Sequence, residues 1–389
     1  MKLRQGNPEE VGMSSERVQR IINLAKGWVD RGDTQAIVML VARKGVVVLY
    51  EAIGHLTPEP DSHPVLLDTI FPIACLTKPI TATSVMILVE DGLLGINRPV
   101  SYYIPEFIGE DKDKVMVHHL LTHTSGIRDA DVDKHAEERK GSIEIPSPDK
   151  NQDPEINEYL FLRYDTPLWK KPGEEMSYSS WGYHTLREIV RRISGEKPDD
   201  FARKRIFEPL EMKDTYSNVP DSKKYRIVKR PKNAPIYEWF ETIAEKGSYW
   251  HDATFSTVMD MAIFGQMFLN KGTYGETRII SPMTVSAMTR NQIPGISAWE
   301  DGEFFPEAEW GLGWSIHGTK KSLAYGEILS SPESVCHGGG GGVLLWVDPT
   351  YDVVASFFFV TLDNSPENAL KKWHGDLVIN SAMAAITEV

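Results

Sequence analysis

Cysteine is scarce in this sequence, since only Cys75 and Cys336 occur among its 389 residues. Two cysteines cannot supply the set of cross-links that holds small secreted domains together. The chain must therefore be stabilised by a buried core, and its 41% content of hydrophobic residues is typical of a globular protein.

The sequence also lacks the pattern of a signal peptide and has no long apolar run. Residues 1–32 are polar and amphipathic, without the apolar stretch and small-residue cleavage site that are typical of a signal peptide. No segment approaches the roughly 20 apolar residues of a membrane-spanning helix. We therefore expect a cytoplasmic protein with no membrane partner, and the alternative of a mature secreted form stays open.

Positive charge is in deficit. The 42 Lys and Arg residues against 55 Asp and Glu residues give a formal net charge of −13. A nucleic-acid partner would require a basic face that displaces counterions from phosphate groups, so this balance argues against one. Charge alone does not identify a substrate, because acidic surfaces mostly serve solubility.

The two ends of the chain are rich in β-branched residues. Ala36–Ala42 and Val46–Ala52 are typical of paired strands, and so are Gly342–Val347 and Val353–Thr361. A short turn joins the members of each pair. The pattern predicts an α+β fold, an α/β sandwich in which an antiparallel sheet from both chain ends is flanked by helices.

Helical patterns dominate the middle of the chain. A length of 389 residues exceeds one ordinary core and favours one large or two closely packed domains. We expect a sheet domain formed by residues 1–75 and 251–389, with a mainly helical inserted domain over residues 76–250. The helices predicted are Ser14–Val29, Lys78–Glu90, Tyr183–Ile193, Asp200–Ile206, Thr257–Leu269 and about Pro366–Ile386.

The segment around Cys75 has the pattern of a reactive site. Pro79 is tolerated only in the first turn of a helix, so we expect a helix to begin near Cys75 and to run through an apolar stretch to Gly92. Lys78 then lies one turn from Cys75 on the same face. A nucleophile beside an amine at a helix start is a reactive arrangement, although an isolated pair of this kind is more often a buried cysteine next to a solvated lysine.

Two further motifs accompany this segment in a fixed order. Tyr178-Ser179-Ser180 follows Pro172-Gly173, and His337-Gly338-Gly339 enters the predicted strand near Val343. Together with Cys75-x-x-Lys78 they resemble the signature of the penicillin-binding protein and class C β-lactamase superfamily, which is S-x-x-K, then Y-x-N, then K-T-G or H-x-G. That superfamily includes D-amino-acid peptidases and the family VIII carboxylesterases. The resemblance implies the β-lactamase/transpeptidase-like fold.

The resemblance also implies a role for each motif residue. Residue 75 attacks the substrate carbonyl, while Lys78 and Tyr178 share the general-base and general-acid work. The backbone N–H groups of Cys75 and Gly340 form the oxyanion hole. Further expected contacts are those of His337 with the substrate or Tyr178, and of Ser180 and Gly339 with the substrate. No cofactor and no metal are implied.

Two positions depart from the family pattern. Ser180 stands where Asn is commonest, and a hydroxyl still offers a donor and an acceptor. Cys75 stands where the family has Ser. This cysteine could be a native thiol nucleophile, a replacement in a serine enzyme, or the mark of a protein that no longer turns over. We favour the replacement, because every neighbouring motif is of the serine type.

Other interpretations of the same residues are weaker. His119 and His123 are spaced as metal ligands on a helix, but they lack the Glu of H-E-x-x-H and match a family stretch, so we favour a structural role. Gly338–Gly342 precedes a strand rather than a helix, which argues against a phosphate-binding loop. No G-x-S-x-G motif occurs, which removes the α/β-hydrolase alternative.

We therefore predict a hydrolase or acyltransferase that acts on a small-molecule ester, amide or lactam through a covalent acyl-enzyme at position 75. An esterase or amidase of the family VIII type is the favoured form. The alternatives are a D-amino-acid peptidase, a β-lactamase, or an inactive ligand-binding relative. No pattern in the sequence indicates how many copies of the chain associate.

Overall fold

The computed structural model describes residues 1–59, 61–149, 151–247, 254–300, 302–321, 326–362 and 374–388. The chain divides into two compact units. The first, the sheet unit, comprises residues 1–77, 207–285 and 316–389. The second, the helical unit, comprises residues 78–206 and 286–315.

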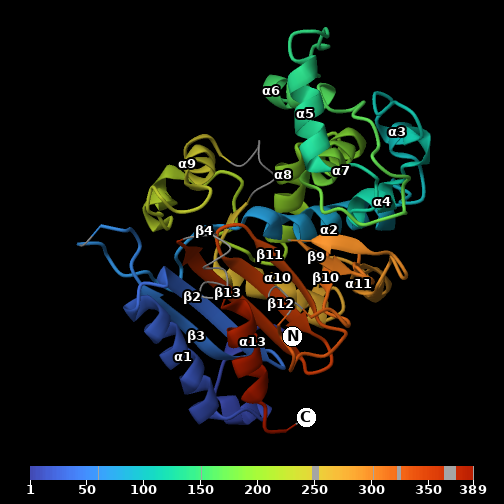
Figure 1. The fold of residues 1–389 in the computed structure, drawn as a ribbon. Helices are drawn as coiled ribbons and strands as arrows, with labels where there is room; N and C mark the ends of the chain where they lie inside the picture. Colours follow the sequence, from blue (N-terminus) through green and yellow to red (C-terminus); the bar gives the residue numbers. More distant parts are fainter. Residues whose placement is uncertain are drawn as a thin grey trace. The chain divides into compact units, whose positions relative to one another are not determined.

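A sheet built from both ends of the chain organises the sheet unit (Figure 1). The N-terminal hairpin β2–β3 and the C-terminal hairpin β12–β13 are each antiparallel, and β13 pairs antiparallel with β2. The strand order is β1-β3-β2-β13-β12-β11-β10. This arrangement confirms the predicted sheet. The strands are β1 (Arg4–Gln5), β2 (Thr34–Arg43), β3 (Val46–Gly54), β10 (Ser315–Ile316), β11 (Val335–Gly339), β12 (Val343–Asp348) and β13 (Val353–Thr361).

Helices cover both faces of this sheet, because its strands place apolar side chains alternately on the two sides. Helices α1 (Ser15–Asp30) and α13 (Gly375–Ala384) lie side by side against one face, where Met39, Trp346 and Phe357 belong to their core. Helix α10 (Val258–Leu269) contacts β12, β13 and β2. Additional short elements are β4 (Phe71–Pro72), α9 (Tyr237–Lys246), β5 (Phe255–Ser256), β6 (Thr273–Tyr274), β7 (Thr277–Arg278) and α11 (Pro282–Thr289).

The ends of these helices follow their sequence signals. Ser14 caps α1 by accepting a hydrogen bond from the N–H of Arg17 at 3.3 Å, and serine is a favoured residue at this position. Of the last predicted helix, residues 375–384 are helical, and residues 366–373 lie outside the described residues. Within the described chain, no helix combines the length and the apolar character needed to span a bilayer.

One helix of the helical unit, α2 (Lys78–Glu90), is buried along almost its whole length. Every residue from Lys78 to Leu88 is buried. Helix α7 (Ser180–Ser194) contacts α2, and Gly313 packs so closely that a Cβ there would lie 2.4 Å from Cβ of Ala82. The remaining elements are α3 (Val100–Tyr103), α4 (Val117–Leu121), α5 (Asp129–Arg139), α6 (Pro154–Phe161), α8 (Pro198–Ala202), β8 (Ala298–Glu300) and β9 (Glu303–Phe305).

Two helical glycines of the sheet unit should respond oppositely to alanine. A Cβ on Gly265 of α10 would lie 2.6 Å from Cγ2 of Val354, so Gly265→Ala should lower the free energy of unfolding by about 1–3 kcal/mol. A Cβ on Gly27 of α1 would meet only the end of the Arg31 side chain, at 3.1 Å. Gly27→Ala should therefore raise the free energy of unfolding by about 0.5–1 kcal/mol. Urea unfolding of both variants checks this pair, and equal effects would contradict the close packing of α10 on the sheet.

Candidate active site

The chain approaches Cys75 through a turn rather than through a regular helix. Residues Ala74–Thr77 form one 3₁₀ turn, and α2 begins only at Lys78. Helical structure therefore begins next to Cys75, as expected, and the α-helix covers the predicted range Lys78–Glu90. The backbone of Ala74 has a φ of +45°, which lies outside the right-handed helical region, so the chain turns sharply just before Cys75.

Ala74 holds this conformation at an energetic cost. A positive φ is unfavourable for a residue with a Cβ, and such residues persist only where the surrounding structure fixes them. Here Ala74 is 5% exposed and its neighbour Ile73 donates its N–H to the carbonyl of Thr254 at 2.8 Å. The turn therefore presents Cys75, a half-buried free thiol, at a fixed place in the sheet unit.

Strand β11 passes very close to this turn. A Cβ on Gly339 would lie 2.2 Å from the carbonyl oxygen of Ile73, so only glycine fits at that position. In the described part of the chain, neither the N–H of Cys75 nor that of Gly340 donates to a backbone carbonyl. The sheet unit thus brings the turn of Cys75 against the strand that ends at Gly339, next to Gly340, as a two-donor oxyanion site requires.

His337 lies on the same strand, two residues before Gly339. It is 4% exposed, and its Nδ1 lies 2.7 Å from the carbonyl oxygen of Gly338. Because a carbonyl can only accept, Nδ1 carries the proton in this contact. Its neighbour Cys336 packs against the core beneath α1 and α13, and the alternation of side chains along the strand places it on the face opposite His337.

Lys78, Tyr178 and Ser180 come together within the helical unit. Lys78 is 1% exposed, and its Nζ donates a hydrogen bond to Oγ of Ser180 at 3.3 Å. The same Nζ lies 4.9 Å from the ring centroid of Tyr178 and 5.6 Å from that of Tyr183. The Lys78 amine is therefore held beside two tyrosine rings and one hydroxyl, and one of these rings belongs to Tyr178, its expected partner in proton transfer.

Asp129 fixes the turn that carries Ser180. Its carboxylate accepts hydrogen bonds from Oγ of Ser179 at 2.6 Å, from N–H of Ser180 at 2.7 Å and from N–H of Trp181 at 3.2 Å. These donors belong to the start of α7, where free N–H groups and the helix dipole favour a negative charge. Sequence reasoning missed Asp129, because no pattern connects positions that are about 50 residues apart.

His123 contacts both the ring of Tyr178 and the backbone of Ser179. Its Nδ1 accepts the N–H of Ser179 at 3.0 Å, and its ring stacks on that of Tyr178 with centroids 4.4 Å apart. His123 itself has a φ of +58° and lies just beyond the end of α4. Trp310 contacts the His123 ring edge-on at 5.0 Å, so the tyrosine is set in a packed aromatic group.

The two histidines of the metal interpretation both bind backbone N–H groups. Nδ1 of His119 accepts from Met116 at 3.0 Å, just as Nδ1 of His123 accepts from Ser179. Burial lowers the pKa of His119 to about 4, which keeps its ring neutral at physiological pH. The described residues contain no group of three or more His, Cys, Asp or Glu side chains arranged to hold a metal ion.

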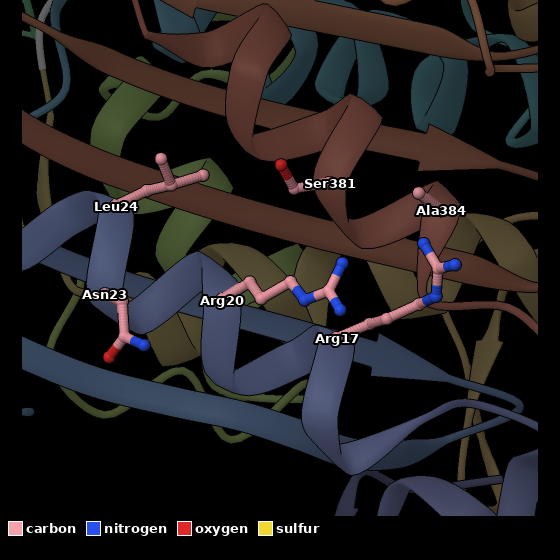
Figure 2. Close-up of a pocket in the computed structure, with 6 residues that line it drawn as sticks. All are labelled: Arg17, Arg20, Asn23, Leu24, Ser381 and Ala384. Carbon is pink, nitrogen blue, oxygen red and sulfur yellow. The ribbon is translucent and has the colours of Figure 1, made fainter.

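A groove of about 490 Å³ lies elsewhere in the sheet unit, between α1 and α13. Figure 2 shows Arg17 and Arg20 of α1 facing Ser381 and Ala384 of α13 across it. Arg20 pairs with Glu16 at 2.5 Å. Arginine stays protonated in proteins and cannot act as a general base, so this groove lacks the means to activate Ser381.

The motif residues thus occupy two local groups. Cys75, His337, Gly339 and Gly340 belong to the sheet unit, where β11 contacts the Ala74–Thr77 turn. Lys78, Tyr178 and Ser180 belong to the helical unit, where their side chains meet. The chain passes from Thr77 directly into Lys78.

Comparison with known proteins identifies relatives along nearly the whole chain. A family model described as "Beta-lactamase" matches residues 21–379. A protein of Salmonella agona, described as "Putative D-alanyl-D-alanine carboxypeptidase", is 26% identical over 419 aligned positions, which cover 98% of this chain and 90% of that protein.

Solved structures share the fold. A penicillin-binding protein homologue from Caulobacter crescentus superposes with a TM-score of 0.73 at 20% identity, covering 96% of this chain and 99% of the other. A family VIII carboxylesterase gives the same TM-score, 0.73, at 20% identity, with the same coverage of 96% and 99%. At these identities the similarity establishes the fold alone.

Asp129 should be worth more to stability than its neighbour on the same helix. Asp129→Ala leaves three donors at the start of α7 without their acceptor, so the free energy of unfolding should fall by about 2 kcal/mol. Asp131 pairs with Arg128 at 2.7 Å, but the two side chains are 36% and 46% exposed. Asp131→Ala should therefore change stability by less than about 0.5 kcal/mol in urea unfolding. Equal losses in the two variants would show that the Asp129 contacts do not hold α7.

Proposed function

Because the chain belongs to the β-lactamase family of hydrolases, we propose that it is an acyl-transfer enzyme that forms a covalent acyl-enzyme at Cys75. The observation that carries the proposal is the close approach of β11 to the turn of Cys75, marked by the 2.2 Å between a Cβ on Gly339 and the carbonyl oxygen of Ile73. That approach supports an arrangement in which the thiol of Cys75 and the N–H groups of Cys75 and Gly340 all face the carbonyl group of one substrate.

The proposed acylation step assigns one action to each group. The Cys75 thiol gives its proton to the Lys78 and Tyr178 pair, and Sγ forms a bond to the substrate carbonyl carbon. The carbonyl oxygen becomes negatively charged and accepts hydrogen bonds from the N–H groups of Cys75 and Gly340. The bond to the leaving oxygen or nitrogen then breaks, and the pair returns the proton to that atom.

Deacylation completes the proposed cycle. Water, or another hydroxyl compound in a transfer reaction, attacks the thioester carbon and gives its proton to the same pair. The Sγ–carbon bond breaks, and the thiol recovers its proton. His337 and Ser180 hold the substrate, and Lys78 keeps its orientation through Oγ of Ser180.

An ester or amide is the proposed substrate class. The Salmonella agona relative is described as a carboxypeptidase and one structural neighbour is a carboxylesterase, so both leaving groups occur among similar proteins. β-Lactams and D-amino-acid peptides are the alternative substrates. An inactive ligand-binding relative is the remaining alternative, and the retention of Lys78, Tyr178 and His337 argues against it, because a decayed site rarely keeps all three.

Turnover of p-nitrophenyl acetate, a D-amino-acid p-nitroanilide and nitrocefin tests the proposal. We expect measurable ester hydrolysis that falls at least about 100-fold in Cys75→Ala, because the covalent step is lost. Cys75→Ser should be more active than the parent chain if the thiol replaces a serine, and inactive if the thiol is native. Cys336→Ala is the matched control and should keep the parent rate. Undiminished hydrolysis by Cys75→Ala would contradict the proposal.

Removing the proton carrier should affect the substrates unequally. Lys78→Met and Tyr178→Phe should each lower kcat by about 100-fold or more on the anilide, whose leaving nitrogen needs a proton. The loss should be smaller on the activated ester, whose leaving group needs little protonation.

Lys112→Met serves as the control for Lys78→Met. Lys112 is a second lysine that is 1% exposed, its Nζ donates to the carbonyl of Tyr164, and burial lowers its pKa to about 7. This substitution should leave kcat unchanged. Equal losses of kcat at Lys78 and Lys112 would show that the effect of Lys78 is only structural.

A further inference from the structure

A segment of the sheet unit packs tightly on the glycine turn that follows β11. A Cβ on Gly341, whose φ is +92°, would lie 2.6 Å from Cζ of Phe240 and 2.7 Å from Nη2 of Arg230. A Cβ on Gly340 would lie 3.1 Å from Cδ1 of Ile236. The 230–240 segment therefore determines where the turn, and with it the N–H of Gly340, can lie.

Arg230 is a buried cation at this contact. It is 4% exposed, its Nη1 donates to the carbonyl of Gly341 at 2.8 Å, and its guanidinium lies 4.0 Å from the ring centroid of Phe240. Nε and Nη2 have no hydrogen-bond acceptor among the described residues. Burial lowers the pKa of Arg230 to about 9, and no carboxylate of the described residues acts to raise it.

This arrangement is not explained by stability. A buried charge without a counter-charge is destabilising. The carbonyl of Gly341 already accepts the N–H of Thr361 at 3.1 Å, so Arg230 is not needed to satisfy it. Features that cost stability at such a site are commonly kept for function.

We propose that Arg230 is a positioning residue of the oxyanion site. Its guanidinium holds the Gly340–Gly342 turn in place and keeps a fixed positive charge next to Gly341. The guanidinium touches the residue next to Gly340 and is too buried to touch a substrate in this structure. Its charge therefore acts through the turn, on the negative charge that develops on the carbonyl oxygen during acylation. Arg230 exchanges no proton in this role. The proposal rests on the proposed function of Cys75 and Gly340.

The sheet unit offers a matched arginine without this role. Arg43 is 1% exposed, and it too donates to backbone carbonyls, those of Val11, Gly12 and Tyr351. Arg43 lies at one end of β2, opposite Val353 of β13. The glycine turn lies near the other end of this strand pair, because Gly342 is beside the carbonyl of Phe359, which lies opposite Ile37. Six residues of strand, or about 20 Å, separate the two pairs. Arg43 is thus a buried arginine far from the turn.

The test compares Arg230→Met, Arg230→Lys and Arg43→Met in kcat and KM for p-nitrophenyl acetate and in thermal midpoint. Arg230→Met removes the charge and keeps the length, so kcat should fall on the order of tenfold to a hundredfold with little change in KM. Its thermal midpoint should stay the same or rise. Arg230→Lys should recover most of kcat. Arg43→Met should lower the thermal midpoint and keep kcat.

Three outcomes would overturn the proposal. Unchanged kcat in Arg230→Met would show that the charge is not used. A loss of kcat with a lower thermal midpoint, without recovery in Arg230→Lys, would show that Arg230 only supports the fold. If the parent chain and Cys75→Ser both fail to form an acyl adduct, the proposed function is wrong, and this inference is wrong with it. If the parent chain is active and Arg230→Met is equally active, only this inference is wrong.

Discussion

Strand β11 passes so close to the carbonyl oxygen of Ile73 that this contact determines how the strand and the turn of Cys75 lie against each other. A side chain at Gly339 would require an atom 2.2 Å from that oxygen, so the strand can reach the turn only with glycine there. The approach places Gly340 next to the turn that carries Cys75, and it coincides with the positive φ of Ala74, +45°. A strained turn and a close strand edge together fix Cys75, the proposed nucleophile, relative to Gly340, whose N–H is a proposed oxyanion donor.

Hydrogen bonds and ring contacts fix Lys78 and Tyr178, the groups proposed to carry the proton. Lys78 is a buried amine whose position depends on Ser180, and Ser180 depends on the carboxylate of Asp129 at the start of α7. Tyr178 depends on the ring of His123. Ser180 and Tyr178 therefore rest on the side chains of Asp129 and His123, which do not meet the substrate in the proposed mechanism. Such support is what holds a catalytic group near its productive geometry.

Much of this could be predicted from the sequence, for identifiable reasons. The hairpins followed from β-branched runs around short turns, and the ordered motifs at Cys75, Tyr178 and His337 predicted the family that the match over residues 21–379 confirms. The range Lys78–Glu90 of α2 was predicted correctly, but the local pattern did not reveal the positive φ of Ala74 just before Cys75. Asp129 and Arg230 were missed for another reason. Their partners lie 51 and 111 residues away at Ser180 and Gly341, and only the folded chain brings them together.

The central claim is that residue 75 becomes covalently acylated, and mass spectrometry measures this directly. The chain is mixed with p-nitrophenyl acetate, quenched in acid within seconds, and digested for peptide mapping. The account predicts one added acetyl group on the peptide that contains Cys75, absent in Cys75→Ala and with no label on Cys336. An adduct spread over lysines, or equal labelling of both cysteines, would contradict it.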